Sequence, residues 1–228
     1  MAYVLGFFYA DGNMEDASYL RGKYIRFNST DKNLIFKIRK WLKSKHTIVQ
    51  LKPIWSNGRK RYLLRIGSHK LYDSLTEKGL YPNKSLTIRF PAIPKQYLKD
   101  FTRGYFDGDG CVFLELSSGK SRKKIVKKLS IIFTSGSYDF LKKMNSELKK
   151  SIELTKDSVY KSNRSFQLRY STADTLKLFK FMYDDFEQDT CLPRKVRVFL
   201  QYLALRPEKV DQTIRKIIYK FKNGHVAK

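Results

Sequence analysis

The sequence predicts an α+β fold made of two pseudo-symmetric units, each with the element order αββαββα. Two observations support this prediction. The stretch Val4-Leu-Gly-Phe-Phe-Tyr-Ala-Asp-Gly12 returns as Thr102-Arg-Gly-Tyr-Phe-Asp-Gly-Asp-Gly110. After each copy, strand and helix patterns follow in the same order, at offsets between 98 and 111 residues, as a duplicated unit would show.

Both copies of this motif indicate a helix that packs closely against another helix. Gly6 and Ala10 are four residues apart, as are Gly104 and Gly108, so each pair shares one helix face. Small residues at this spacing let two backbones approach closely. We therefore expect Gly6, Ala10, Gly104 and Gly108 to form a helix–helix interface.

Each motif ends in an Asp-Gly pair, and the glycines suit the left-handed conformation that ends many helices. Asp11 and Asp109 would then lie at C-terminal helix ends, where the helix dipole disfavours a carboxylate. If the two helices pair side by side, the carboxylates meet. A bound divalent cation would relieve that conflict, and oxygen-only ligation suits Mg²⁺.

The rest of the first unit is assigned from alternation and helical spacing. Residues 13–23 show no clear pattern, whereas Ile25 and Phe27 alternate with polar neighbours as in a half-buried strand. The expected elements are a strand over 24–28, a helix over 30–42, a weak strand near 48–54, a hairpin turn over 56–59, a strand over 61–66 and a helix over 68–78 that Gly79 ends.

Two prolines separate the halves. Pro91 and Pro94 prevent a helix around them and stiffen an extended segment. We therefore expect a first unit over residues 1–90, a linker over 91–98 and a second unit over 99–228.

The second unit repeats the order. Its last stretch, 207–222, reads as a basic amphipathic helix with an apolar stripe, and docking on the second unit is favoured over a separate DNA-binding arm. The expected elements are a strand over 111–116, a Ser/Gly/Lys-rich loop over 117–128, a strand over 129–134, a helix opening at 135–139, a weak strand near 157–161, a turn over 162–165, a strand over 166–170, a helix over 172–183, and the stripe Val210, Ile214, Ile217, Ile218 and Phe221.

Composition narrows the class of protein. The chain has 228 residues, with 47 Lys and Arg against 21 Asp and Glu, a net charge of +26 and a pI near 10.0. A polyanion partner is the natural interpretation, and nucleic acid is the commonest one. A membrane surface is disfavoured because the basic residues run through the whole chain rather than forming one flanking cluster.

Cysteine and histidine chemistry is not indicated. Two cysteines are too few for a disulfide framework, so Cys111 and Cys191 are expected to be reduced packing residues. The three histidines are scattered, which argues against a histidine-based nuclease site. No apolar run is long enough for a membrane span and no signal peptide is evident, so an intracellular protein is expected, in a bacterial or phage-infected cytoplasm or an organelle.

The paired motifs resemble those of the LAGLIDADG homing endonucleases, in the form that carries two motifs on one chain. Gly104-Tyr-Phe-Asp-Gly-Asp-Gly110 matches closely, while the first copy has Tyr9 where the motif has its first Asp. That position is not the metal-binding one. The resemblance implies the αββαββα unit, with two sheets forming a saddle on DNA and the motif helices at its centre.

The resemblance also implies residue roles. Asp11 and Asp109 would be catalytic and hold Mg²⁺, with one acid per active site and with Mn²⁺ or Ca²⁺ able to substitute in binding. The carbonyls of Ala10 and Gly108 would also contact metal. Basic residues near each scissile phosphate match Lys84 and Lys195, in Tyr81-Pro-Asn-Lys84 and Leu192-Pro-Arg-Lys195. A lone lysine in so basic a chain is usually a solvated charge, but repetition at matched positions favours a function.

Two further pairs recur at matched positions. Ser29 and Ser135 stand where many members of the family carry a Gln, and a hydroxyl orients water over a shorter reach. Arg65 and Arg169 are open to two interpretations, phosphate binding or a salt bridge.

Sheets read DNA through side chains on alternate strand positions in the major groove. Polar residues on exposed strand faces are common, so each one is weak evidence alone, but together they form a broad basic surface. The outward residues expected to contact DNA are Tyr24, Arg26, Asn28, Arg59, Arg61, Arg65, Phe113, Glu115, Ser130, Ile132, Thr134, Ser165, Gln167 and Arg169.

Together with the resemblance, these features predict a monomeric, site-specific double-strand DNA endonuclease of the kind that supports intron homing. By resemblance it would hydrolyse phosphodiesters with Mg²⁺ across the minor groove of a long asymmetric target and leave short 3′ overhangs. Two alternatives stay open: an RNA-binding intron maturase, and a catalytically silent DNA-binding regulator on the same fold. The presence of both motif acids favours the nuclease.

Overall fold

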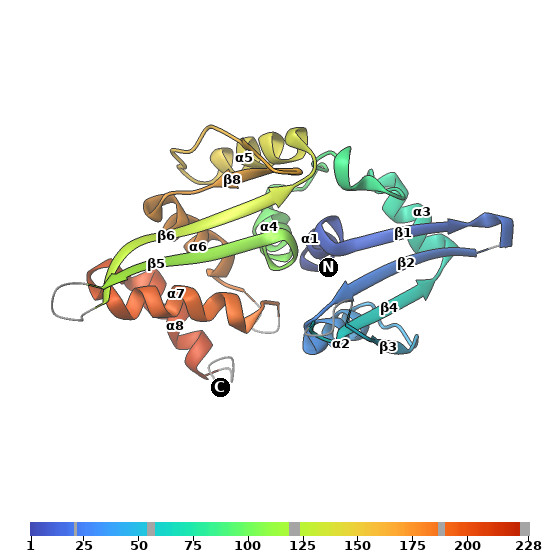
Figure 1. Ribbon diagram of the computed structural model, residues 1–228, viewed down its shortest axis with the longest axis horizontal. Coiled ribbons are helices and arrows are strands. Elements are labelled where there is room, and N and C mark those ends of the chain that lie inside the picture. The colour runs from blue at the N-terminus through green and yellow to red at the C-terminus, as the bar shows by residue number, and fades with distance from the viewer. Residues whose placement is uncertain (21, 54–57, 119–123, 187–189, 224–228) are drawn as a thin grey trace.

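Two four-stranded antiparallel sheets flank a central pair of helices (Figure 1). The structure is a computed structural model that describes residues 1–20, 22–53, 58–118, 124–186 and 190–223. The central helices are α1 (Ala2–Asp11) and α4 (Lys95–Asp109), which contain the two copies of the motif. The predicted α+β architecture of two similar units, with the motif helices at their interface, is confirmed.

Both sheets have the same topology. The strand orders are β1-β2-β4-β3 and β5-β6-β8-β7. The strands are β1 (Gly12–Ala17), β2 (Gly22–Ser29), β3 (Ile48–Leu51), β4 (Arg61–Gly67), β5 (Gly110–Ser118), β6 (Lys124–Ser135), β7 (Tyr160–Ser162) and β8 (Ser165–Arg169). The remaining α-helices are α2 (Lys32–Trp41), α3 (His69–Glu77), α5 (Tyr138–Ser151), α6 (Thr172–Tyr183), α7 (Pro193–Leu205) and α8 (Gln212–Asn223), and the short 3₁₀ helices are η1 (Ser18–Leu20), η2 (Lys84–Leu86) and η3 (Pro207–Lys209).

Strand register repeats between the units. Gly12 at the start of β1 pairs with Phe27, and Gly110 at the start of β5 pairs with Phe133. The register of a sheet with one buried face is fixed by its hydrophobic pattern. The same pattern, with buried Phe27 and Phe133 on β2 and β6, therefore produces the same register twice.

The core runs without a break through both units. Aromatic rings join them: Phe140 of α5 lies 6.1 Å from Tyr9 of α1 and 4.7 Å from Tyr105 of α4, centroid to centroid. Phe90, which precedes α4, contacts Phe101 and Phe140 at 5.3 and 5.4 Å. These rings bury apolar area across the pseudo-symmetry axis and hold the two sheets in one body.

Three strand boundaries differ from the sequence prediction. β1 (Gly12–Ala17) covers the first part of the stretch 13–23, which shows no clear pattern because only Met14 and Ala17 of the six residues of β1 are buried apolar side chains. The expected loop over 117–128 is largely strand, since β5 ends at Ser118 and β6 begins at Lys124. The expected turn over 56–59 lies partly outside the described residues.

Three helix boundaries also differ. α4 begins at Lys95, so the linker ends at Pro94 rather than at residue 98; Pro94 is the N-cap of α4, and its fixed φ suits that place. α7 was not predicted, although Pro193 at its first turn is a common start signal. α8 begins at Gln212, later than residue 207, and Phe221 packs on Tyr183 and Phe186, so docking on the second unit is confirmed.

The two cysteines differ in their surroundings. Cys191 is buried, as expected for a packing residue. Cys111 is exposed at the start of β5, so the expectation that it packs in the core is wrong. It falls on the outward face of the strand, because its neighbour Val112 takes the inward one.

Candidate active site

The two motif helices pack backbone against backbone through their small residues. A Cβ atom on Gly6, or on Gly104, would lie inside 3.0 Å of a backbone carbonyl of the opposite helix. One turn later, a Cβ on Gly108 would overlap the side chain of Ala10. Because this contact face extends to the last turn of both helices, their C-terminal ends lie together.

Gly12 and Gly110 follow the motif helices, but not in the expected left-handed conformation. Their φ values are −80° and −90°, with extended ψ values, so that expectation is wrong. Neither position has room for a side chain, because a Cβ on Gly12 would overlap Phe8 and one on Gly110 would overlap Phe106. The glycines thus let the chain pass over an aromatic ring straight into β1 and β5.

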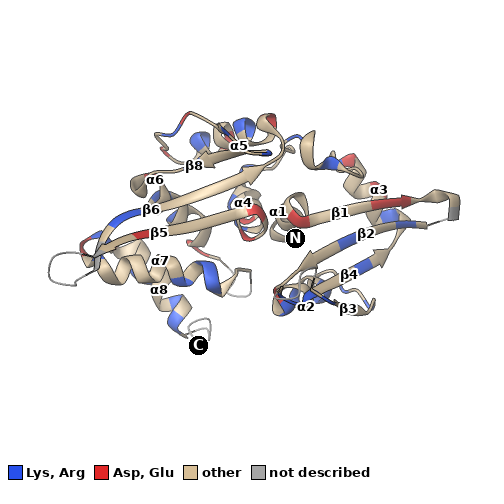
Figure 2. Ribbon diagram, in the orientation of Figure 1, with Lys and Arg blue, Asp and Glu red and all other residues tan. Residues whose placement is uncertain are grey.

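Asp11 and Asp109 lie at the adjacent C-terminal ends of α1 and α4 (Figure 2). The Oδ2 atom of Asp11 is 3.3 Å from the point where a Cβ on Gly108 would stand, one residue before Asp109. Burial raises the pKa of Asp109 to about 6, and the negative charge of Asp11 adds to the effect. Burial also raises the pKa of Asp11, against the attraction of nearby lysines. The two carboxylates therefore share one electrostatic environment.

Lys84 and Lys195 are both buried beside these acids, with 5% and 4% of their surface exposed. Lys84 donates to the carbonyl of Gly12 at 2.7 Å, and Lys195 donates to the carbonyl of Gly110 at 2.6 Å. Burial lowers the pKa of Lys84 and lowers that of Lys195 to about 8. The matched sequence positions thus occupy matched positions in space, on the last glycine of each motif.

The two lysines differ in how many of their N–H donors bond to backbone carbonyls. Lys195 also donates to the carbonyls of Phe106 and, at 3.0 Å, of Asp107. An ammonium group has three N–H donors, so the last turn of α4 uses all of those on Lys195. Within the described residues, Lys84 has a single carbonyl acceptor. Lys84 therefore keeps donors for a ligand, whereas Lys195 fixes the end of α4.

We expect Lys195→Met to destabilise the fold more than Lys84→Met. The first substitution removes three hydrogen bonds to buried carbonyls and the second removes one, at about 1 kcal/mol net for each. Urea unfolding of both variants measures the difference, which should reach about 2 kcal/mol. Equal losses would show that the additional contacts of Lys195 carry no net stability.

Three residues without a role in the sequence analysis anchor the motif helices. Tyr3 of α1 donates to Asp107 of α4 at 2.6 Å, and the buried Arg103 donates to carbonyls at and beyond the end of α6. In the first motif the position of Asp107 is taken by Tyr9, which donates to the Lys78 carbonyl. The only sequence signal was this mismatch between the two copies, which gives each motif helix a different anchor.

The donor set fits a hard divalent cation. Besides the two carboxylates, the carbonyls of Ala10 and Gly108 lie in the last helical turns, where no later helical N–H reaches them. Mg²⁺ and Ca²⁺ prefer such oxygen ligands. No cluster of three or more His, Cys, Asp or Glu occurs in the part of the chain that the structure describes. Asp11 and Asp109 are the carboxylates beside these two carbonyls.

Asp109→Asn is expected to stabilise the metal-free protein near neutral pH. The folded-state pKa of Asp109, about 6, lies above its ordinary value, so ionisation disfavours folding. This penalty is absent below about pH 4, grows as the pH rises to about 6 and then stays, at on the order of 1–3 kcal/mol. Urea unfolding in EDTA should show a gain for the variant that vanishes toward pH 4. A gain independent of pH would contradict this account.

The residues expected to contact DNA lie on the outward faces of the two sheets, with two exceptions. Arg59, expected on a strand, precedes β4, which begins at Arg61. Ser130 is only 4% exposed, so its expected exposure is wrong. It lies opposite the larger side chain of Phe113 on β5. Exposed members of the set are Arg59, Arg65, Phe113 and Arg169, and half-buried members are Tyr24, Arg26, Asn28, Arg61, Glu115, Ile132, Thr134, Ser165 and Gln167.

The recurring arginines make different contacts. Arg65 donates to both carboxylate oxygens of Glu15, at 3.2 and 2.9 Å, and its guanidinium lies 3.5 Å from the ring centroid of Tyr24. Arg169 donates to Gln167 at 3.1 Å. An exposed ion pair of this kind is worth little to stability. Arg65 is thus in a salt bridge, which is one of the two interpretations given from the sequence. Its charge still faces solvent.

The recurring serines end β2 and β6, two residues before the N-caps of α2 and α5. Ser29 accepts the backbone N–H of Asp31 at 3.1 Å, and Ser135 accepts that of Ser137 at 3.1 Å. Hydroxyls commonly satisfy a backbone N–H two residues on at such turns. Both residues therefore have a local structural contact at matched positions, before α2 and α5.

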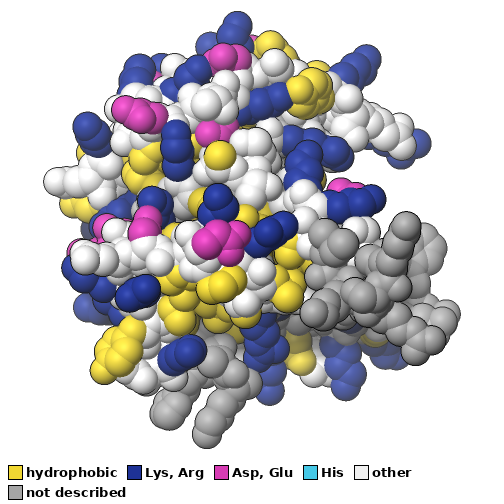
Figure 3. Space-filling model, turned by 90° about the vertical axis from the view of Figure 1, so that its left-hand side faces the viewer, with side chains coloured by type: hydrophobic (Ala, Val, Ile, Leu, Met, Phe, Trp, Pro, Cys, Tyr) yellow, Lys and Arg dark blue, Asp and Glu magenta, His cyan; other side chains and the backbone are white. Residues whose placement is uncertain are grey.

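Basic side chains occur on every part of the molecule. Figure 2 shows Lys and Arg on helices and strands of both units, and Figure 3 shows them spread over one end rather than gathered in one spot. Over the described ranges, none of the helices is long and apolar enough to cross a membrane.

Comparisons with known proteins identify the fold. No protein-family model matches the chain, and a search of curated proteins found no match. Among solved structures, the homing endonuclease I-WcaI bound to its DNA recognition sequence has a TM-score of 0.60 at 14% identity, over 86% of this chain and 83% of that one. The LAGLIDADG meganuclease I-AabMI bound to uncleaved DNA has 0.57 at 13%, over 97% and 96%.

A third structure widens the range of proteins with this architecture. The N-terminal LAGLIDADG domain of DUF199/WhiA has a TM-score of 0.53 at 13% identity, over 86% of this chain and 85% of that one. The chain therefore has the LAGLIDADG fold, with both motifs on a single chain.

Proposed function

We propose that this protein is a monomeric, site-specific double-strand DNA endonuclease. The observation that supports this most is the meeting of Asp11 and Asp109 at the ends of two helices packed backbone to backbone, between two sheets with basic outward faces. The structural neighbours bound to DNA support the same substrate.

In this proposal each acid serves the cleavage of one strand. Mg²⁺, when bound, neutralises charge on the scissile phosphate and lowers the pKa of a bound water. Asp11 and Asp109 would hold it, with the carbonyls of Ala10 and Gly108. Lys84 directs its remaining N–H donors toward the phosphate and stabilises the developing charge. Lys195 is expected to act near the other phosphate. To do so, it must release one of its carbonyl acceptors on α4 and donate to the phosphate instead.

The sheet faces supply binding. Arginine and polar side chains on alternate strand positions contact phosphates and base edges, so affinity falls steeply with added salt. Because both strands must reach the central acids, the duplex is bent over the site, and cleavage across the minor groove leaves short 3′ overhangs. Such an activity is the one that intron homing requires.

A cleavage screen tests the proposal. The full chain is incubated with a library of long DNA duplexes and Mg²⁺, in parallel with EDTA, and ends are mapped by sequencing. Cutting of both strands at one rare sequence, abolished by EDTA, is expected. Tight sequence-specific binding without nicking would favour the silent DNA-binding regulator, and selective binding of a structured intron RNA would favour the maturase.

Thermal unfolding tests metal binding separately from DNA cleavage. Mg²⁺ is expected to raise the melting temperature of the wild type but not of the Asp11→Asn, Asp109→Asn double variant. A ligand that binds only the folded state at ten times its Kd stabilises it by about 1.4 kcal/mol. Differential scanning fluorimetry with and without EDTA measures this shift, and K⁺ at equal ionic strength is the control. An equal shift in both proteins would place the ion elsewhere.

A further inference from the structure

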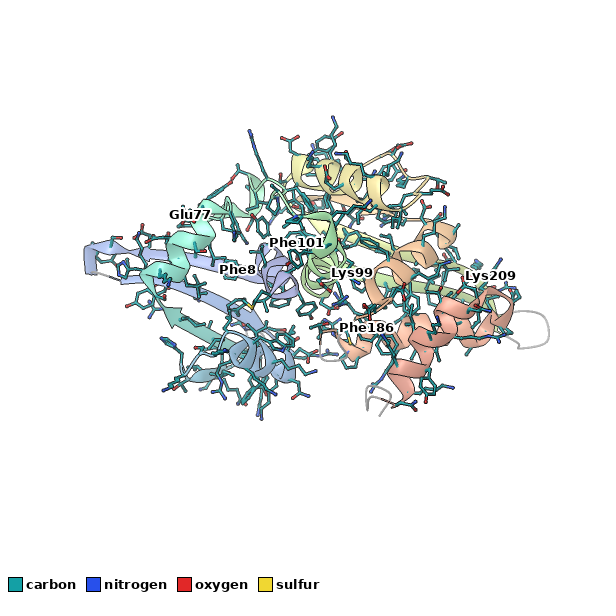
Figure 4. All side chains as sticks on the ribbon, turned by 180° about the vertical axis from the view of Figure 1, so that it is seen from behind. Phe8, Glu77, Lys99, Phe101, Phe186 and Lys209 are labelled. Atoms are coloured by element: carbon teal, nitrogen blue, oxygen red, sulfur yellow. The ribbon has the colours of Figure 1, made fainter. Side chains whose placement is uncertain are left out.

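One row of side chains crosses three strands on the outward face of the first sheet. Asn28 of β2 pairs with Leu63 of β4, and Leu63 pairs with Val49 of β3. Paired residues share a face, and this face is the outward one because the next residue of β4, Leu64, is buried. Helices cover the other face: Figure 4 shows α3, which ends at the labelled Glu77, lying across the back of the sheet.

The two apolar members of this row do not contribute to the core. Across the described residues, the core and the partly buried apolar side chains that pack against it include neither Leu63 nor Val49. Val49 is 48% exposed, and Leu63 is half-buried. Apolar surface left in water at this place gains free energy when a ligand covers the sheet.

The polar member of the row is not committed to a protein contact. The Oδ1 atom of Asn28 is buried and accepts no hydrogen bond from the described residues. A buried acceptor without a donor costs free energy. Turning the amide outward, toward a ligand that offers a donor, removes that cost.

Arginines on both sides of the row indicate the class of ligand. Arg61 and Arg65 stand two residues before and after Leu63 on β4, so they share its face. Arg26 of β2 lies opposite Arg65. The acid Glu15 pairs with Arg26 and Arg65, at 3.7 and 2.9 Å. This group of three arginines and one acid has a net positive charge, which favours a polyanion whose phosphates meet the arginines while its bases face the row.

The second unit carries polar side chains in the matched row. Thr134 of β6 pairs with Gln167 of β8, which pairs with Tyr160 of β7. The ammonium of Lys156 lies 4.0 Å from the ring centroid of Tyr160. Because the register is the same in both sheets, the two rows differ in chemistry and not in place. The two units therefore present different groups to the two halves of a DNA target.

We propose that the row of Asn28, Leu63 and Val49 reads A·T base pairs in the major groove, with the amide bonded to adenine and the aliphatic side chains on thymine methyl groups. Adenine presents an N7 acceptor and an N6 donor there, which an asparagine amide matches with two hydrogen bonds, and thymine presents its methyl group. Paired residues on adjacent strands lie about 5 Å apart, so the row fits a groove about 12 Å wide. The inference rests on the DNA binding of the proposed function and specifies bases in one half of the target.

Removal of single thymine methyl groups tests this inference. The full chain, in EDTA so that binding is measured without cleavage, selects bound sequences from a library of long random DNA duplexes. A selected duplex is then remade with deoxyuridine in place of one thymine at a time, and affinities are measured by fluorescence anisotropy. We expect wild type to bind about fourfold more weakly where a contacted methyl is lost, the effect of one buried methyl group, and only within one half of the site.

Variants assign the effect to the row. The Leu63→Ser, Val49→Ser double variant should bind the thymine and deoxyuridine duplexes equally. Asn28→Ala should lose about tenfold of the discrimination between A·T and G·C at the neighbouring pair. Leu205→Ser, which alters a leucine that is 40% exposed at the end of α7, is the matched control and should keep the wild-type response to deoxyuridine.

Two results would overturn the inference alone. One is sequence-specific binding that no deoxyuridine substitution weakens, a comparison made with wild-type protein and therefore independent of how well a variant folds. The other is a double variant with a normal melting temperature that still distinguishes thymine from deoxyuridine, which would place the methyl contact elsewhere. The absence of any sequence-specific binding would instead overturn the proposed function, and this inference with it.

Discussion

Asp109→Asn is expected to reduce DNA cleavage by about 10³-fold or more while leaving target affinity within a few-fold of wild type. An amide is nearly isosteric with the carboxylate but lacks the charge that holds Mg²⁺, and the contact with DNA lies on the sheet faces rather than at this residue. Asp11→Asn should act equally strongly, because the two acids lie at one point. Single-turnover cleavage and gel-shift affinity, at the same salt concentration, measure the two effects.

The matched control is Asp73→Asn, which alters an exposed acid on α3 that pairs with Lys23. It should cleave within about twofold of wild type, since an exposed ion pair contributes little. Cleavage of both strands at the normal rate by either motif variant would show that the carboxylates do not hold the metal. Loss of both cleavage and DNA affinity would instead indicate a collapse of the helix interface.

Much of this centre was readable from the sequence because it depends on local spacing. Gly6, Ala10, Gly104 and Gly108 mark a helix contact face through their four-residue spacing, and the acids follow in the next positions. Lys84 and Lys195 were singled out because they match the basic positions that the family resemblance implies and because they recur at matched points of the two units. Each alone would have been one basic residue among 47.

What the sequence did not predict depends on contacts between distant segments. The polar β1 is a strand because β2 pairs with it, and only two of its residues carry apolar pattern. Gly12 and Gly110 are glycines because of aromatic rings beneath them, not because of a left-handed backbone. Lys195 donates to three carbonyls, whereas Lys84 donates to one. This difference depends on where α7, which carries Lys195, begins relative to α4.

Gly104→Ala is expected to destabilise the protein by about 3 kcal/mol or more, a large part of the 5–15 kcal/mol typical of a domain. The added methyl would lie inside 3.0 Å of the Tyr3 carbonyl, a backbone atom that moves only if α1 and α4 separate. Gly67→Ala is the control: its Cβ would meet only the Tyr24 ring, at 3.1 Å, and we expect a change within about 1 kcal/mol. Urea unfolding in EDTA compares them. Because the same contact places Asp11 beside Asp109, any folded Gly104→Ala protein should also lose the Mg²⁺-dependent rise in melting temperature. A variant with wild-type stability and metal response would mean that the helices tolerate a wider separation than their glycines indicate.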